Sequence, residues 1–162
     1  MSGFDSAFDA LIANEGGYSN NRHDPGGETR WGITKRVAQV HGYTGAMWDL
    51  PLVTAKEIAK AQYWNPIKGD EFPERFAFQV FDAAYNSGVG TAIRWLQQAV
   101  GVLADGSIGP VTLTAVKAHE PDWIIARFDG LRLRYLADLK AWPNFGRGWA
   151  HRIADNLLKE AS

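Results

Sequence analysis

Hydrophobic side chains recur at helical spacing along most of the chain, and glycine or proline interrupts them at regular intervals. Apolar residues from Phe4 to Ile12 follow the spacing i, i+4, i+7, i+8, which predicts a first helix ending at Gly16-Gly17. The same pattern predicts six further helices: one capped by Thr54 that stops near Asn65-Pro66, one carrying Phe76 to Ala84 that ends at Asn86-Ser87-Gly88, one capped by Thr91 and closed by Gly101, one from Pro110 to about His119, one from Asp122 to about Ala141, and one carrying Trp149, Ile153 and Leu157.

The segment from Tyr18 to Thr34 interrupts this pattern. It is rich in Asn, Gly and Pro, and Thr29, Trp31 and Ile33 alternate as in a short strand. We therefore expect a mainly α fold with a small β-hairpin after the first helix. Because the charge balance changes only mildly near residue 94, we expect residues 1–94 as a catalytic lobe and 95–162 as a helical lobe, packed as one compact domain.

Composition narrows the class of protein further. With 162 residues, 46% hydrophobic and 22% charged, the chain has the composition of a folded globular protein. The absence of cysteine excludes disulfide scaffolds and thiol catalysis, and a net charge of −1 argues against nucleic acid as the main partner. No apolar run approaches the ~20 residues of a membrane span, and the acidic start carrying Asp5 and Asp9 does not resemble a secretory signal.

Glu15 is the first candidate catalytic residue. It lies in the last turn of the predicted first helix, where the negative end of the helix dipole disfavours a carboxylate. This dipole and nearby apolar groups would raise the pKa of Glu15, which suits an acid that must hold a proton at neutral pH. The alternative is a solvated surface glutamate, which is the more frequent case for a single Glu at a helix end.

Asp24 and Thr29 could complete a catalytic set with Glu15. Asp24 lies nine positions after Glu15, in a turn with Pro25 that could direct its carboxylate back toward the helix end, and Thr29 could orient a water beside it. An acid, a carboxylate and a hydroxyl are the groups that glycoside hydrolysis needs. The alternative for Asp24 is an Asx-turn made with its own backbone.

The segment from Glu15 to Thr34 reads Glu-Gly-Gly-Tyr, then Asp-Pro-Gly-Gly-Glu-Thr, then Trp-Gly-Ile-Thr. These motifs resemble the signature of glycoside hydrolase family 108, small peptidoglycan muramidases of phage endolysins and prophage regions, and the resemblance extends over nearly the whole chain. It implies a lysozyme-like fold and the role of general acid for Glu15. The spacing of Glu15, Asp24 and Thr29 is also similar to that of phage-type lysozymes of another family.

Candidate sugar contacts come from a second motif and from aromatic residues. In the motif from Phe81 to Gly88, the residues Asp82, Tyr85 and Asn86 share one helix face, and in lysozyme-like folds this helix borders the cleft. The alternative is that Asn86 caps the helix and the Tyr85 hydroxyl is satisfied in the core. Tyr18 and Trp31 offer flat faces for a sugar ring, whereas Trp95, Trp123 and Trp149 fall on helical stripes and are expected to pack internally.

The C-terminal part carries a third motif. Residues 96–102, followed by Asp105-Gly106 and Gly109-Pro110, resemble helical peptidoglycan-binding segments, although a glycine cap, a turn and a proline-started helix would give a similar pattern without a ligand. Six basic residues could contact an anionic envelope surface, or form a solvated helix face: Arg127, Arg132, Arg134, Lys140, Arg147 and Arg152.

We predict neither a metal nor a cofactor, because the four histidines lack ligand spacing with carboxylates and Gly88-Val89-Gly90 lacks the context of a nucleotide loop. The leading hypothesis is a monomeric muramidase that hydrolyses glycan strands of peptidoglycan. A lytic transglycosylase and a noncatalytic peptidoglycan-binding module remain as alternatives. The resemblance further implies synthesis in a bacterial cytoplasm and action on the wall in the periplasm after release.

Overall fold

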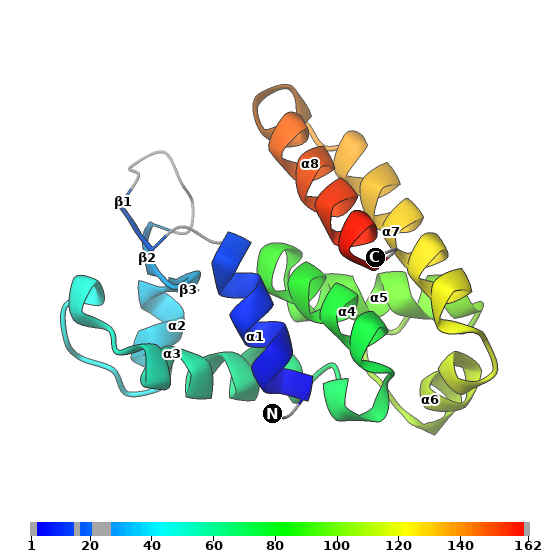
Figure 1. Cartoon of the computed structure of the whole chain (residues 1–162), viewed down its shortest axis with the longest axis horizontal. Coiled ribbons are helices and arrows are strands. Elements are labelled where there is room, and N and C mark those ends of the chain that lie inside the picture. Colours follow the sequence, from blue (N-terminus) through cyan, green and yellow to red (C-terminus); the bar gives the residue numbers. More distant parts are fainter. Residues whose placement is uncertain (1–2, 15–16, 21–26, 161–162) are drawn as a thin grey trace.

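A small antiparallel sheet follows the first helix, and helices make up most of the remaining chain (Figure 1). We describe a computed structural model that covers residues 3–14, 17–20 and 27–160. The elements are α1 (Gly3–Asn14), β1 (Tyr18–Asn20), β2 (Glu28–Arg30), β3 (Ile33–Thr34), α2 (Lys35–Val40), the 3-10 turn η1 (Met47–Asp49), α3 (Leu52–Ala59), the π-helical η2 (Lys60–Trp64), the 3-10 turn η3 (Gly69–Glu71), α4 (Glu74–Ser87), α5 (Val89–Val100), α6 (Pro110–Lys117), α7 (Pro121–Ala137) and α8 (Trp142–Glu160). This order confirms the predicted mainly α, lysozyme-like fold with a small β element after the first helix.

The sheet has three strands in the order β1-β2-β3, each antiparallel to its neighbour. The prediction of one strand through Thr29, Trp31 and Ile33 was wrong, because a two-residue turn divides it into β2 and β3. The two turn residues, Trp31 and Gly32, have φ of 53° and 71°. Positive φ at both central residues is the geometry that matches the twist of paired strands, and glycine adopts it readily whereas tryptophan does so rarely.

Two helix starts differ from the predicted caps. The helix expected to be capped by Thr54 begins three residues earlier, with Pro51 at the cap position, and continues through the π-helical turn to Trp64. The helix expected to be capped by Thr91 begins at Val89, because Gly88, with φ of 91°, ends α4 and starts α5 without a loop between them. Gly101 adopts the left-handed conformation and closes α5 as predicted.

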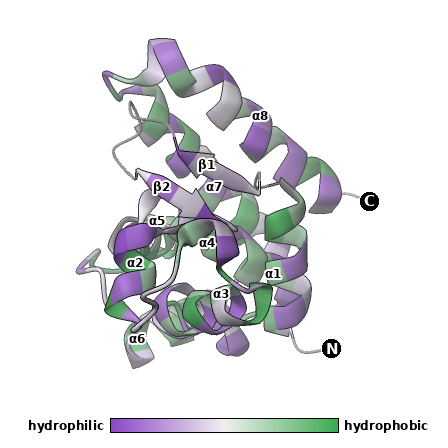
Figure 2. Ribbon diagram, turned by 90° about the vertical axis from the view of Figure 1, so that its left-hand side faces the viewer, coloured by the Kyte–Doolittle hydropathy of each residue, from purple (hydrophilic) through white to green (hydrophobic). Residues whose placement is uncertain are grey.

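The C-terminal helices also differ in extent from the prediction. Helix α7 ends at Ala137, and α8, with 19 residues, is longer than α7 with 17. The two helices lie side by side (Figure 1). Hydrophilic residues follow much of α8 and of the strands (Figure 2).

Aromatic side chains from α1, η2 and α4 form the centre of the apolar core. The ring centroids of Phe4 and Phe81 each lie 5.5 Å from that of Trp64, in edge-to-face geometry. The buried cluster continues through α5 to Phe128 on α7, whose ring lies 5.9 Å from Phe76. Edge-to-face pairs add about 0.5–1.5 kcal/mol each to the free energy of burial, so these contacts fix how α1 and α4 cross.

Gln97 organises the loop between α5 and α6. Its side chain is 1% exposed, and its amide donates to the Asp105 carboxylate at 2.8 Å and the Ser107 carbonyl at 3.0 Å, while accepting from the Gly106 amide at 2.9 Å. The hydrogen bond from Gln97, followed by one from the Ser107 backbone, lowers the pKa of Asp105. The third sequence motif therefore has a structural role in fixing this turn.

Candidate catalytic cleft

Three segments distant in sequence meet at the turn between β2 and β3. The Trp31 amide donates to the Gly17 carbonyl at 3.0 Å, and the Trp31 indole donates to the Leu50 carbonyl at 3.0 Å. The Tyr85 hydroxyl, from the end of α4, donates to the Trp31 carbonyl at 2.9 Å. Trp31 is thus held by three hydrogen bonds in a backbone conformation that costs free energy for a non-glycine residue.

The candidate catalytic residues are only partly within the described chain. Glu15 and Asp24 lie outside the described residues. Thr29 is the central residue of β2, half-buried, and pairs with Ser19 on one side and Thr34 on the other. Their catalytic roles therefore stay predictions.

Tyr18 at the start of β1 donates its hydroxyl to the Glu28 carboxylate at 2.8 Å. This hydrogen bond, more than burial or the nearby negative charge, raises the pKa of Tyr18 and lowers that of Glu28. Lys35 lies 3.3 Å from the other oxygen of Glu28 and contributes to the lowered pKa. Glu28 is therefore a charged acceptor on the sheet, and sequence reasoning assigned it no role.

An aromatic cluster lies at the sheet. It consists of the rings of Tyr18, Trp31 and Trp48 together with the guanidinium of Arg30. The guanidinium of Arg30 lies 4.4 Å from the ring centroid of Trp31 and 5.2 Å from that of Trp48. The ring centroids of Tyr18 and Trp48 lie 5.0 Å apart, and the ring planes meet at 77°. Trp48 remains 60% exposed, so the cluster presents an aromatic surface of the kind that sugars bind.

Sequence reasoning missed Trp48 and Arg30 as parts of this surface. Trp48 lies in a short 3-10 turn outside any helical or strand periodicity, and it reaches the sheet only because η1 packs against β2. The one feature of the sequence that could have identified Trp48 is its place in a connecting segment, where no helical pattern of apolar residues requires a tryptophan for packing.

The prediction that Asp82 contacts sugar was wrong. Its side chain is 0% exposed, and its Oδ2 accepts from Arg132 at 2.8 Å and from Asn156 at 2.9 Å. Its Oδ1 accepts from Arg152 Nε at 2.9 Å. Burial acts to raise the pKa of Asp82, but the charges and hydrogen bonds of the two arginines outweigh it and hold the pKa below its usual range.

This buried ion cluster also reduces the basic surface expected in the C-terminal part. Arg132 is 1% exposed, and Arg152 is half-buried against Asp82. Arg127 donates to the Ala99 carbonyl at 2.7 Å and lies over the ring of Trp123. Trp123 itself is 43% exposed, so its predicted place in the core was wrong, because α7 turns this side chain outward.

Asn86 and Tyr85 differ in what they offer to a substrate. The ring of Tyr85 packs on Tyr63 at 4.5 Å, and its hydroxyl donates to Trp31. Asn86 is exposed and lines a cavity of about 310 Å³ together with Trp149, Arg152 and other residues of α8. The end of α4 thus contacts the sheet through one residue and faces α8 with the next.

Across residues 3–14, 17–20 and 27–160, no group of three or more His, Asp or Glu side chains is arranged to hold a metal ion. Within the same ranges, none of the helices combines the length and the hydrophobicity of a membrane-spanning segment.

Comparison with known proteins matches two parts of the chain to two family models. The family model for Glycosyl hydrolase 108 matches residues 8–88, which include α1, the sheet and α4. The chain belongs to glycosyl hydrolase family 108. A second model, described as a predicted peptidoglycan domain, matches residues 91–154, from α5 into α8.

A solved structure supports this assignment. The chain is 34% identical to Brucella abortus SagA, with a TM-score of 0.88, over 94% of this chain and 90% of that one. No curated protein matches the chain. Together the family matches make this protein a glycoside hydrolase that acts on peptidoglycan.

Proposed function

We propose that this family 108 member is a muramidase, which hydrolyses the bond between N-acetylmuramic acid and N-acetylglucosamine with Glu15 as general acid. The observation that carries the proposal is the match of residues 8–88 to a glycoside hydrolase family, because this range contains the Glu15, Asp24 and Thr29 set. The described part of the same range presents an aromatic cluster on the sheet and, at the end of α4, the exposed amide of Asn86, and both kinds of group suit a sugar ligand.

The proposed reaction is a displacement by water at the anomeric carbon. Glu15 gives its proton to the glycosidic oxygen as the bond to the anomeric carbon breaks, and positive charge develops on the sugar ring. Asp24 accepts a proton from the attacking water, and Thr29 orients that water through its hydroxyl. The products are a reducing end at the muramic acid and a free hydroxyl on the departing sugar.

The described side chains divide into sugar contacts and supports. Tyr18, Trp31 and Trp48 would pack against sugar rings, and Asn86 would bond a hydroxyl or N-acetyl group. Tyr85 would hold Trp31 in place through its hydroxyl. Asp82 would act only through the packing of α8, since its carboxylate is buried.

Mass spectrometry of digested glycan strands tests the reaction directly. A muramidase adds one water at each cleaved bond, and we expect reducing muramic acid ends. Anhydromuramic ends would instead identify a lytic transglycosylase, which needs no activated water. Binding to peptidoglycan without release of any new ends would identify a noncatalytic module.

The biological setting is part of the proposal. The resemblance to endolysins supports a phage or prophage enzyme that is made in the bacterial cytoplasm and reaches the wall in the periplasm through a pore. We propose that it works as a monomer, with an exposed set of Arg134, Lys140 and Arg147 near the anionic envelope. Addition from outside to cells with a permeabilised outer membrane, followed by turbidity, tests whether access alone limits lysis.

A further inference from the structure

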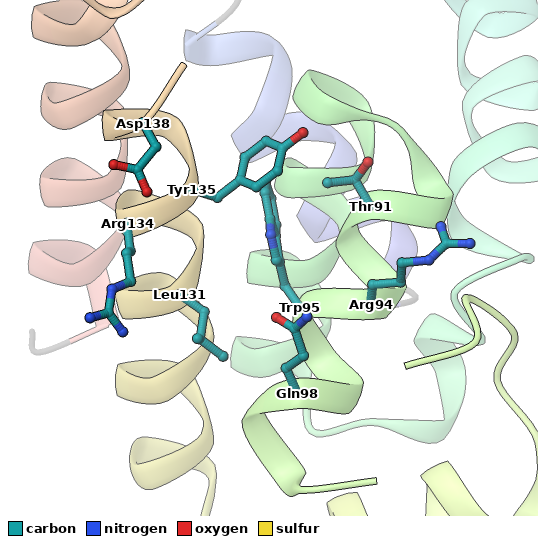
Figure 3. Close-up of a pocket in the computed structure, with 8 residues that line it drawn as sticks. All are labelled: Thr91, Arg94, Trp95, Gln98, Leu131, Arg134, Tyr135 and Asp138. Atoms are coloured by element: carbon teal, nitrogen blue, oxygen red, sulfur yellow. The ribbon is translucent and has the colours of Figure 1, made fainter. Parts of the chain in front are cut away.

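A groove that shares no lining residue with the cavity beside Asn86 lies between α5 and α7. Its cavity of about 350 Å³ is lined by Thr91, Trp95 and Gln98 from α5 and by Arg134, Tyr135 and Asp138 from α7 and its end (Figure 3). All of these residues fall within the segment matched by the peptidoglycan domain. Ligand sites measure about 300–1,000 Å³, so this groove has room for a small ligand, such as one sugar unit.

The groove contains an aromatic ring that is fixed and half-exposed. Tyr135 meets Trp95 edge to face, with ring centroids 5.3 Å apart and planes at 66°. Trp95 is 3% exposed and lies 6.3 Å from Phe128 in the core, so it cannot move away from Tyr135. Tyr135 is 47% exposed and therefore offers a ring face whose orientation is set by buried packing.

The groove is lined by two arginines and one aspartate, and the guanidinium of one of these arginines, Arg94, is directed away from the ring of Tyr135 (Figure 3). Gln98, Arg134 and Asp138 are all exposed at the edges of the groove, where they contribute one amide, one positive and one negative group. Arg94 also borders the groove, but its guanidinium lies within 3.5 Å of the Asp105 carbonyl, on the side of the α5–α6 loop. An acidic stem peptide would be recognised by an excess of positive charge, whereas hydroxyls and an N-acetyl group suit amide and mixed polar partners.

We propose that the groove between α5 and α7 is a noncatalytic binding site for an N-acetylhexosamine unit of the glycan strand. The apolar face of the sugar stacks on Tyr135, and its polar substituents bond Gln98 and Asp138. The residues that line the groove belong to neither the proposed catalytic set nor the aromatic cluster on the sheet, so the groove adds a contact to glycan beyond the one at the cleaved bond. A second contact raises the effective concentration of the enzyme at the wall without changing the chemical step.

The site is tested by comparing binding to insoluble peptidoglycan with turnover of a short soluble glycan. We expect Tyr135→Ala to weaken co-sedimentation with purified sacculi on ice about tenfold, and to turn over soluble glycan oligomers within twofold of the wild type. Gln98→Ala, which changes an exposed helix position, should weaken co-sedimentation in the same direction. Thermal unfolding of each variant verifies that it is folded.

Trp123→Ala is the matched control, because Trp123 is a similarly exposed aromatic residue on the same helix outside the groove. It should co-sediment like the wild type. Wild-type co-sedimentation of both Tyr135→Ala and Gln98→Ala would overturn the site. Sacculi stripped of stem peptides by an amidase should still bind the wild type, and loss of that binding would overturn the sugar as ligand.

The proposed reaction can fail independently of this site. Absence of turnover by the wild-type protein would refute the muramidase proposal, while a sedimentation defect confined to the groove variants would still support the binding site. Conversely, normal turnover with unchanged sedimentation of the groove variants would refute only the binding site.

Discussion

The hydroxyl of Tyr85 donates a 2.9 Å hydrogen bond to the backbone carbonyl of Trp31, a residue 54 positions earlier in the chain. This bond joins the end of α4 to the turn between β2 and β3. A Cβ on Gly32, the other turn residue, would lie 2.5 Å from Cε1 of Tyr85, so the ring packs directly on the glycine backbone. The left-handed conformation of Trp31 is therefore fixed by α4 and not by the turn alone.

Tyr85→Phe removes the hydroxyl and keeps the ring against Gly32. We expect the free energy of unfolding to fall by about 1 kcal/mol, since the Trp31 carbonyl loses a donor. The melting temperature should fall by about 2–4 °C for a chain of this length. Tyr43→Phe is the control, because the Tyr43 hydroxyl also bonds a backbone carbonyl, that of Ala46, but at an exposed position. A Tyr85→Phe protein as stable as Tyr43→Phe would contradict this role.

The buried carboxylate of Asp82 connects α4 with α7 and α8. Asp82→Asn removes the buried negative charge that pairs with Arg132 and Arg152, so we expect a loss of about 3–5 kcal/mol in the free energy of unfolding. Glu71→Gln, which breaks the exposed pair with Lys117, should cost at most about 1 kcal/mol. Urea unfolding at neutral pH measures the free energy of unfolding of both variants. Equal losses would show that the buried Asp82 cluster stabilises the fold no more than an exposed ion pair does.

The pH dependence of stability gives a second test of the same cluster. The pKa of Asp82 is lower in the folded state than in the unfolded chain, so the unfolded state binds more protons as the pH falls. The stabilisation by Asp82 is complete above the ordinary aspartate pKa of about 3.9 and is lost as the pH falls through the lower folded value. The wild type should therefore lose more stability than Asp82→Asn when urea unfolding is moved from pH 6 to pH 2.5. Parallel losses would mean that other carboxylates dominate acid unfolding.

Local sequence patterns predicted most of the helices, although not α2, and only some of the site contacts. The spacing of apolar residues from Phe76 to Ala84 was enough to place α4, and Gly101 was enough to end α5, because both signals act within a few residues. The same spacing placed Asp82 on a polar face with Tyr85 and Asn86. The spacing could not reveal that Arg132 and Arg152, 50 and 70 residues away in sequence, bond to the Asp82 carboxylate. These contacts bury the part of the face that carries Asp82.

The sheet shows the same limit of prediction from local sequence patterns. Alternation of Thr29, Trp31 and Ile33 correctly indicated extended backbone at Thr29 and Ile33 but not at Trp31, where the turn depends on Tyr85 and on the Leu50 carbonyl. Trp48 reaches Tyr18 and Arg30 only through the packing of η1 on β2. Such contacts join segments that no local pattern relates, so the aromatic cluster could be identified only in the folded chain.

Glu15→Gln tests the proposed general acid. Glutamine has nearly the same shape but cannot donate the proton, so we expect activity on peptidoglycan to fall by about 10²–10⁴-fold. The melting temperature should stay within a few degrees of the wild type. Release of reducing ends from purified sacculi measures the activity, and Glu57→Gln, at an exposed position of α3, is the control. Near wild-type activity of Glu15→Gln would falsify the assignment.

Trp48→Ala tests whether the aromatic cluster binds substrate. The side chain is 60% exposed, but it makes an edge-to-face contact with Tyr18 and a cation–π contact with Arg30, so its loss should lower the free energy of unfolding by about 1–2 kcal/mol. It also removes the ring that orients Tyr18 and one of the two rings beside Arg30, so the surface offered to sugar becomes smaller and less ordered. We expect KM for soluble glycan oligomers to rise about tenfold, equivalent to 1.4 kcal/mol of binding, with a smaller change in kcat. Trp48→Phe should recover part of the loss, and Trp123→Ala should leave KM unchanged. A wild-type KM in Trp48→Ala would contradict the proposal that the aromatic cluster binds the glycan.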